Sequence, residues 1–215
     1  MRSRDPNLLY ITKSFVFNSG GPVTIPTQEE RLQAEETLAY IRDTMESAST
    51  STAVSGWGVV GVGAIGLIAT WLSWAPGASS LLVVWIPTAL IAGLVSGAAN
   101  VTKAKRLDVP LWSGSFRKMA WGLAPALVAG ALLTQALTAA GATHLLPGMW
   151  LVLYGAGVTA SGTFSVRALR WMGLTMLTLG SLALVSPDLG LAVLGVGFGA
   201  AHVGFGFYIA QRHGG

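Results

Sequence analysis

The sequence contains no cysteine and very few charges. The absence of cysteine excludes disulfides, thiolate metal sites and cysteine nucleophiles. Charged residues make up 10% of the chain, far below the roughly 25% of soluble domains, whereas hydrophobic residues make up 52%. The sequence also has no P-loop, GxSxG or HExxH motif, and seven of its nine acidic residues lie before residue 50. Acid–base catalysis needs titratable side chains within reach of each other, and only two acidic residues follow residue 50. We therefore expect a protein that is not an enzyme.

Six apolar segments are each long enough to cross a membrane. They lie at about residues 54–74, 80–100, 117–139, 145–165, 168–186 and 189–210, and about 20 residues suffice to cross about 30 Å of hydrocarbon. Trp85 and Trp150 lie near the ends of their segments, which we interpret as an aromatic belt at the interface. The sequence therefore predicts an all-α, polytopic membrane protein with six transmembrane helices over residues 54–210 and a short tail over 211–215.

The basic residues lie on one side of these segments. The connections after the first, third and fifth segments contain no Lys or Arg, so all 13 basic residues fall on one side if both termini are cytoplasmic. We predict this orientation, with a cytoplasmic tail. The net charge of +4 then reflects membrane topology, and we expect no nucleic-acid partner.

The segment before the first span contains an amphipathic helix. Residues 1–25 form an N-terminal arm, and disorder is one hypothesis for it. Because Lys13 interrupts the apolar stretch of this arm, we expect no cleavable signal peptide. Thr27 and Glu30 have the spacing of a capping box, which predicts a helix from about Gln28 to Ser47 within the region 26–50. Its apolar stripe includes the candidate partner-binding residues Leu38, Ile41 and Met45. This stripe either packs on the membrane domain or a sister copy, or binds a separate protein.

Glycines mark the surfaces where helices can approach closely. The second segment contains Gly93 and Gly97, and the last contains Gly195 and Gly199, each pair with GxxxG spacing. In lipid, such small residues let helix backbones come together. Contact within one chain, contact between copies in a homo-oligomer or membrane complex, and a path lined by backbone remain open alternatives.

His202 is the one ionisable residue that we place deep within a predicted span. Such residues are energetically costly in a membrane and often mark a functional path or a buried partner. Three roles are open: a neutral ring that holds helices together, a gate or proton sensor, and an axial ligand to haem or another tetrapyrrole. The other two histidines lie near segment ends, so we expect no metal site and no cofactor other than lipid.

Polar residues on the third and fourth segments form a seam beside this histidine. The candidate pore or substrate residues are His202, Gln135, Tyr154, Thr159 and Ser161. Because the seam is neutral, it suits a transporter or channel-like protein for a neutral or amphiphilic small solute. This function predicts a cavity between the third, fourth and sixth segments. Two alternatives remain: a non-transporting membrane partner or sensor that recruits another protein through helix 28–47, and a pigment- or haem-associated subunit.

Several stretches resemble an uncharacterised family of bacterial six-span inner-membrane proteins. They are YIRDTME at 40–46, VSGWG at 54–58, LPGMWLVLYGAG at 146–157, SVR at 165–167, HVGFG at 202–206 and QRHGG at 211–215. The last two spans are also similar to those of HdeD-type acid-resistance membrane proteins. The resemblance covers residues 28–215 and implies a multi-pass protein of the bacterial inner membrane. It implies no activity, so no functional residue is carried over from it.

Overall fold

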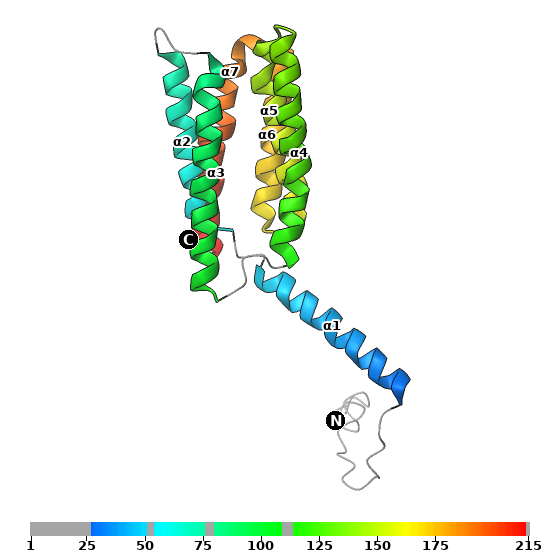
Figure 1. Cartoon of the computed structure of the whole chain (residues 1–215). Coiled ribbons are helices and arrows are strands. Elements are labelled where there is room, and N and C mark those ends of the chain that lie inside the picture. Colours follow the sequence, from blue (N-terminus) through cyan, green and yellow to red (C-terminus); the bar gives the residue numbers. More distant parts are fainter. Residues whose placement is uncertain (1–26, 51–53, 76–79, 109–113, 214–215) are drawn as a thin grey trace, which may run out of the picture. The chain divides into compact units, whose positions relative to one another are not determined.

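The computed structural model describes residues 27–50, 54–75, 80–108 and 114–213, and these residues are helical, without strands (Figure 1). Six of the described helices are long and apolar enough to cross a membrane, which confirms the predicted number. The chain is therefore a multi-pass helical membrane protein. The predicted arm over residues 1–25 and the last two residues of the tail lie outside the described residues.

Helix α1 (Gln28–Thr50) begins at the predicted capping box. The Thr27 backbone N–H donates to Glu30 Oε2 at 2.8 Å, and the Glu30 N–H donates to Thr27 Oγ1 at 3.3 Å. These two bonds satisfy backbone donors that the helix itself leaves without partners. The apolar stripe at Leu38, Ile41 and Met45 is exposed. The helix ends three residues beyond the predicted Ser47.

The spans have nearly the predicted limits. The first four are α2 (Gly56–Trp74), α3 (Leu81–Arg106), α4 (Gly114–Ala139), and α5 (Leu146–Ser161) between the short turns η2 (Thr143–Leu145) and η3 (Gly162–Phe164). The fifth is α6 (Arg167–Val185). The last span combines η4 (Pro187–Leu189), α7 (Gly190–Leu194), the π-helical segment η5 (Gly195–Ala201) and α8 (His202–His213). The largest difference is at α3, which continues six residues past the predicted end at residue 100.

Two antiparallel helix pairs are held together by glycines, and both pairs use the same geometry. A methyl group added at Gly206 would lie 2.6 Å from the Val60 nitrogen, and one added at Gly180 would lie 2.6 Å from the Val152 nitrogen. In each helix of a pair, two glycines seven residues apart face the partner helix: Gly56 and Gly63 in α2, Gly199 and Gly206 in the last span, Gly148 and Gly155 in α5, and Gly173 and Gly180 in α6. Backbones this close exclude any larger side chain, so each pair is a tightly packed unit.

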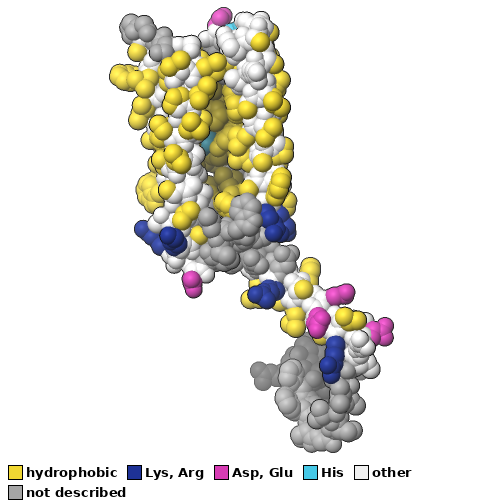
Figure 2. Space-filling model, in the orientation of Figure 1, with side chains coloured by type: hydrophobic (Ala, Val, Ile, Leu, Met, Phe, Trp, Pro, Cys, Tyr) yellow, Lys and Arg dark blue, Asp and Glu magenta, His cyan; other side chains and the backbone are white. Residues whose placement is uncertain are grey.

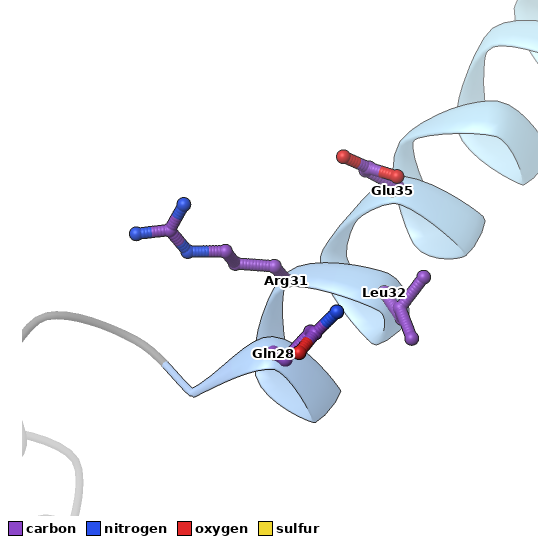
Figure 3. A pocket seen from close by; sticks show the side chains of 4 residues that line it. All are labelled: Gln28, Arg31, Leu32 and Glu35. Atoms are coloured by element: carbon purple, nitrogen blue, oxygen red, sulfur yellow. The ribbon is translucent and has the colours of Figure 1, made fainter.

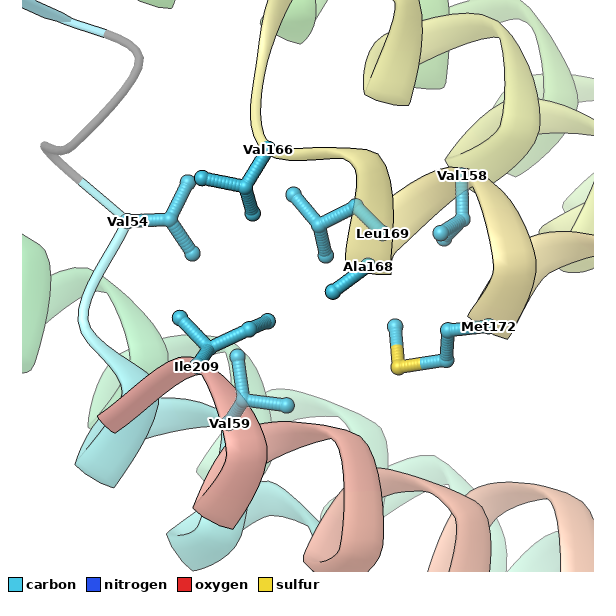
Figure 4. Packing of buried hydrophobic residues seen from close by; sticks show 8 residues of the cluster. All are labelled: Val54, Val59, Val158, Val166, Ala168, Leu169, Met172 and Ile209. Carbon is cyan, nitrogen blue, oxygen red and sulfur yellow. The ribbon is translucent and has the colours of Figure 1, made fainter. Parts of the chain in front are cut away.

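The spans form two groups of three. The α2 group consists of α2, α3 and the last span, and the α5 group consists of α4, α5 and α6, with α3 packed on α2 and α4 packed on α5 (Figure 1). The groups meet through apolar side chains. In one cluster, Val54, Val59 and Ile209 of the α2 group face side chains of the α5 group (Figure 4). Those side chains are Val158, Val166, Ala168, Leu169 and Met172. A second cluster, which includes Leu151, Met176 and Leu194, joins the same groups further along the spans.

The two predicted glycine motifs lie in different surroundings. Gly195 lies against Thr70 and Gly199 against Leu67, so added methyl groups would be 2.6 Å and 2.5 Å from these side chains. At Gly93 and Gly97, an added methyl group would have no described atom within 4 Å. The motif in the last span therefore packs within the chain, whereas the motif in α3 faces open space.

Lys103 connects the start of the first span to the end of the last span. Its side chain is buried, and Nζ donates to the carbonyl oxygens of Val54 and His213, both at 3.0 Å. Nearby, Asn100 Oδ1 accepts a hydrogen bond from the Ser55 N–H at 2.9 Å. The start of α2 and the end of α8 thus lie at the same end of the bundle, where Figure 2 shows Lys and Arg side chains gathered. This arrangement agrees with an even number of spans; which side is cytoplasmic stays a prediction.

We expect Lys103→Met to lower the stability of the protein in detergent. The substitution keeps the length of the side chain but removes two charge-assisted hydrogen bonds to helix ends, a loss of about 2–3 kcal/mol in unfolding free energy. Thermal unfolding measures the effect, and Lys105→Met is the matched control because Lys105 is exposed on the same helix. Equal melting temperatures for the two variants would show that the Lys103 contacts do not stabilise the bundle.

Candidate functional site

A cavity of about 530 Å³ lies between α3 and α4. Figure 2 shows the hollow that separates the two groups of spans. Its volume falls in the range of about 300–1,000 Å³ that is usual for small-molecule sites. The lining residues are Val62 and Gly66 of α2; Leu81, Leu82, Trp85, Ile86, Thr88, Ala89, Ala92, Gly93 and Ser96 of α3; Leu123, Leu127, Ala131 and Thr134 of α4; Leu146, Pro147, Trp150 and Tyr154 of α5; and Leu194 and Phe198 of the last span. Spans three, four and six contribute, as the sequence predicted. Span two contributes more of the lining than any other span, and span one adds Val62 and Gly66.

The cavity is elongated along the spans. On α3, lining residues recur every three or four positions from Leu82 to Ser96, which places them on one face of the helix. The lining begins at Leu81, and fifteen residues of α-helix rise about 22 Å. Leu123, Leu127, Ala131 and Thr134 form the matching stripe on α4. The cavity is therefore a slot that covers most of the thickness of a membrane core.

Aromatic side chains form the base of this slot. The rings of Tyr154 and Phe198 have centroids 5.0 Å apart, and those of Trp85 and Phe198 are 6.0 Å apart. Tyr154 belongs to the α5 group, while Trp85 and Phe198 belong to the α2 group. The aromatic base therefore bridges the two groups, and a molecule in the slot would contact both.

Polar groups along the slot are mostly engaged with the protein. Trp85 Nε1 donates to Ser73 Oγ at 3.1 Å, and Trp150 Nε1 donates to Thr134 Oγ1 at 2.9 Å. The hydroxyls of Thr88 and Thr134 donate to the carbonyl oxygens four residues earlier. The slot has no charged side chain among its described lining residues. It therefore offers an apolar, neutral surface with few free hydrogen-bond donors.

His202 lies directly behind the aromatic base and is almost completely buried, with 2% of its surface exposed. Its Nδ1 is 3.1 Å from the Gly197 carbonyl oxygen, and its Nε2 is 3.2 Å from Tyr154 Oη. Because a carbonyl oxygen only accepts, Nδ1 carries the proton. In the neutral ring, Nε2 then accepts the hydrogen bond that the Tyr154 hydroxyl donates. This pair links the last span to α5, and so links the two groups of spans.

The π-helical segment η5 positions the histidine. Gly197 and His202 are five residues apart, and this is the spacing that a π-helix brings together along its axis. The ring of His202 also stacks on that of Phe198, with centroids 5.8 Å apart and planes inclined by 13°. The irregular segment η5 therefore supplies the aromatic lining residue Phe198 and ends directly before His202, which supports Tyr154 from behind.

The other residues of the predicted seam lie away from the slot. Gln135 is exposed and does not line it. Thr159 Oγ1 donates to the Gly155 carbonyl oxygen at 2.7 Å, and Ser161 Oγ donates to the Met119 carbonyl oxygen at 2.8 Å, which ties α5 to α4. The structure brings only Tyr154 and His202 together. Sequence reasoning missed the wall formed by α3, although Ala89, Ala92, Gly93 and Ser96 form a stripe of small residues.

A second hollow and the possible metal or haem ligands offer fewer functional groups than the slot. The hollow, on α1, is shallow and is lined by Gln28, Arg31, Leu32 and Glu35, all from one helix (Figure 3). Among the described residues, no three His, Cys, Asp or Glu side chains are placed to hold a metal ion. Both ring nitrogens of His202 are hydrogen-bonded, so an axial bond to haem would require one of these bonds to break.

Comparisons with known protein families, with curated proteins and with solved structures found no match for this chain. The resemblances to the uncharacterised six-span family and to HdeD-type proteins therefore stay predictions. The chemistry of the slot carries the functional proposal.

Proposed function

We propose that this protein is a transporter that holds a small amphiphilic solute in the slot between α3 and α4. The observation that carries this proposal is the elongated, uncharged cavity between two separately packed groups of spans. A small inorganic ion would need charged or carbonyl ligands along its whole path, and no charged side chain lines the slot among the described residues. The slot therefore suits the apolar part of an amphiphile, whose head group can lie at one end.

The arrangement of the two groups supports movement of one against the other. Glycine contacts pack each helix pair tightly, whereas the two clusters between the groups consist of apolar side chains. The Tyr154–His202 hydrogen bond and the contact of Gly197 with Leu151 also join the groups, so movement would have to occur around these contacts. Each span of the α2 group also has a counterpart of opposite direction in the α5 group: α2 with α5, α3 with α4, and the last span with α6. The matched spans follow a different order along the chain in the two groups, so they do not form an inverted repeat. A site between two helix groups that rock against each other is nevertheless typical of transporters.

The first test measures how fast a labelled lysophospholipid crosses the bilayer of reconstituted vesicles. One zwitterionic and one anionic lysophospholipid carry an NBD label, and dithionite destroys the fluorescence of the outer leaflet. We expect the protein to accelerate the crossing of at least one probe several-fold over protein-free vesicles.

A variant tests whether crossing uses the slot. Ala92→Phe should remove this acceleration because Ala92 lines the slot. The control is Ala98→Phe, on the exposed face of the same helix. Unchanged crossing of both probes by the wild-type protein would refute the proposal.

A second candidate function rests on the exposed stripe of α1. Leu38, Ile41 and Met45 are 65%, 46% and 68% exposed, which suits a helix that recruits another protein. Deletion of residues 1–47 distinguishes the candidates. A transporter keeps its lysophospholipid crossing after this deletion, whereas a recruiting subunit loses a co-purifying partner and shows no crossing in either form.

A further inference from the structure

We infer that the slot takes the hydrocarbon chain of a single-chain amphiphile with an anionic head group, and that the head group lies at the Ser96 end. This inference rests on the proposed function and narrows its substrate class. Three observations carry it: the length and lining of the slot, the position of the one unengaged hydroxyl, and the distribution of charge along α3 and α4.

The length and lining of the slot suit one extended hydrocarbon chain. The slot follows α3 for about 22 Å. Carbon–carbon bonds of about 1.5 Å advance a zigzag chain by about 1.3 Å per carbon, so roughly 17 carbons span this length. Apart from the hydroxyls of Thr88, Ser96, Thr134 and Tyr154, the side chains of the lining are aliphatic or aromatic, and the two indole N–H groups are already engaged. A sugar or peptide would find few donors there, whereas a hydrocarbon chain needs none.

The unengaged hydroxyl belongs to Ser96. Thr88, Thr134 and Tyr154 also line the slot, and each has a hydrogen-bond partner within the protein. For Ser96, the described part of the chain provides none, and a methyl group added at neighbouring Gly93 or Gly97 would meet open space. In lipid, a hydroxyl normally bonds to its own helix or to a neighbour. Ser96 is therefore free to donate to a ligand at this end of the slot.

The distribution of charged residues also favours an anionic head group at the Ser96 end. Beyond Ser96, α3 ends with Lys105 and Arg106, and α4 begins with Arg117 and Lys118 on the other wall. Asp108 follows α3 at this end, so the basic side chains outnumber the acidic one. Near the opposite end of the spans, the described charged side chain is Asp188. Lys and Arg side chains extend along the membrane interface toward polar groups. An anionic head group at the Ser96 end is thus attracted, and a cationic one is repelled.

Photolabelling tests both the class of ligand and its direction. The probe is palmitic acid with a diazirine at the last carbons of its chain, added to the full-length protein in phosphatidylcholine vesicles and mapped by mass spectrometry. We expect labels near Leu82, Trp85 and Leu146, at the far end from Ser96. Excess palmitate should remove at least three-quarters of the labelling, whereas hexadecanol should compete less and hexadecylammonium least. Equal competition by the three compounds, or labels mainly near Ser96 and Leu123, would overturn the inference.

Variants distinguish labelling within the slot from labelling of the rest of the bilayer-exposed surface. Ala92→Phe should reduce labelling several-fold, and Ala98→Phe should leave it unchanged. The double variant Arg106→Gln/Arg117→Gln should remove the preference for palmitate over hexadecanol, whereas Arg170→Gln/Arg212→Gln, with the same change in net charge, should retain it. Labelling that is equal in Ala92→Phe and Ala98→Phe would also overturn the inference.

Accelerated lysophospholipid crossing without labelling of the slot would contradict this inference but leave the transporter proposal in place. Labelling of the slot without crossing would contradict the transporter proposal.

Discussion

Replacement of Gly63 by valine is expected to prevent assembly of the bundle, whereas replacement of Gly97 by valine is expected to be tolerated. A side chain at Gly63 would begin 2.6 Å from the Val203 nitrogen and 2.8 Å from the Gly199 carbonyl oxygen. Both are backbone atoms, which move only if the whole last span moves. Overpacking of a core typically costs about 1–3 kcal/mol. We expect the upper end of this range or more at Gly63, because no flexible side chain can give way.

Size-exclusion chromatography and thermal unfolding in detergent measure this effect. Gly63→Val should yield mostly aggregated protein, and Gly155→Val should behave alike because its added side chain would begin 2.7 Å from the Leu177 nitrogen in the equivalent position of the other pair. Gly97→Val should stay within about 0.5 kcal/mol of the wild type, as is usual for exposed positions. Similar yields and melting temperatures for Gly63→Val and Gly97→Val would contradict the packing described here.

The Gly97 variant also tests whether two copies of the chain pack against each other at this motif. Gly93 lines the slot, and methyl groups added at Gly93 or Gly97 would meet no neighbouring helix, so a homo-oligomer that uses the GxxxG motif would place a second copy against the open side of the slot. A Gly97→Val protein that keeps its melting temperature but elutes as a smaller species would support this contact. An unchanged elution volume would exclude it.

Replacement of His202 by leucine is expected to have the second-largest effect. The substitution removes both hydrogen bonds of the ring and leaves the Tyr154 hydroxyl without its acceptor in the interior. Unsatisfied buried groups cost about 1–3 kcal/mol each, so we expect a loss of about 2–4 kcal/mol in unfolding free energy. Tyr154→Phe removes one bond and should cost only about 1 kcal/mol. Tyr208→Phe is the control, because Tyr208 is exposed.

The double variant tests whether the two residues act through each other. If the Tyr154–His202 hydrogen bond links the groups of spans, the combined loss in Tyr154→Phe/His202→Leu should be smaller than the sum of the single losses by about 1 kcal/mol. Strict additivity would show that the pair is not coupled. Lysophospholipid crossing by Tyr154→Phe then separates the remaining roles of His202: a role in gating changes the rate of crossing, whereas a purely structural role changes only the melting temperature.

Several features were predictable because they depend on residues close together in the sequence. The capping box at Thr27 and Glu30 is local chemistry, and it formed as expected. The six spans follow from the cost of placing polar groups in hydrocarbon, which adds up residue by residue along a segment. His202 stood out for the same reason, and Tyr154 was among the polar residues that the sequence analysis placed beside it.

The face that each span turns inward was not predictable in this way. In water, a helix buries its apolar side, but a helix in lipid is apolar all round, so hydropathy does not reveal its rotation. The glycines at Gly93 and Gly195 have the same spacing, yet only Gly195 meets another helix. Gln135 and Thr134 are neighbours, yet only Thr134 lines the slot.

Composition, hydropathy and short-range spacing were thus sufficient for the number of spans, their approximate limits and the residue that is most unusual in the membrane. Tertiary packing decided the pairing of α2 with the last span, the slot between α3 and α4, and the π-helical segment that directs His202 toward Tyr154. The physical reason is that these features arise from contacts between residues distant in sequence. Such contacts depend on close steric fit between helix surfaces, which local hydropathy does not encode.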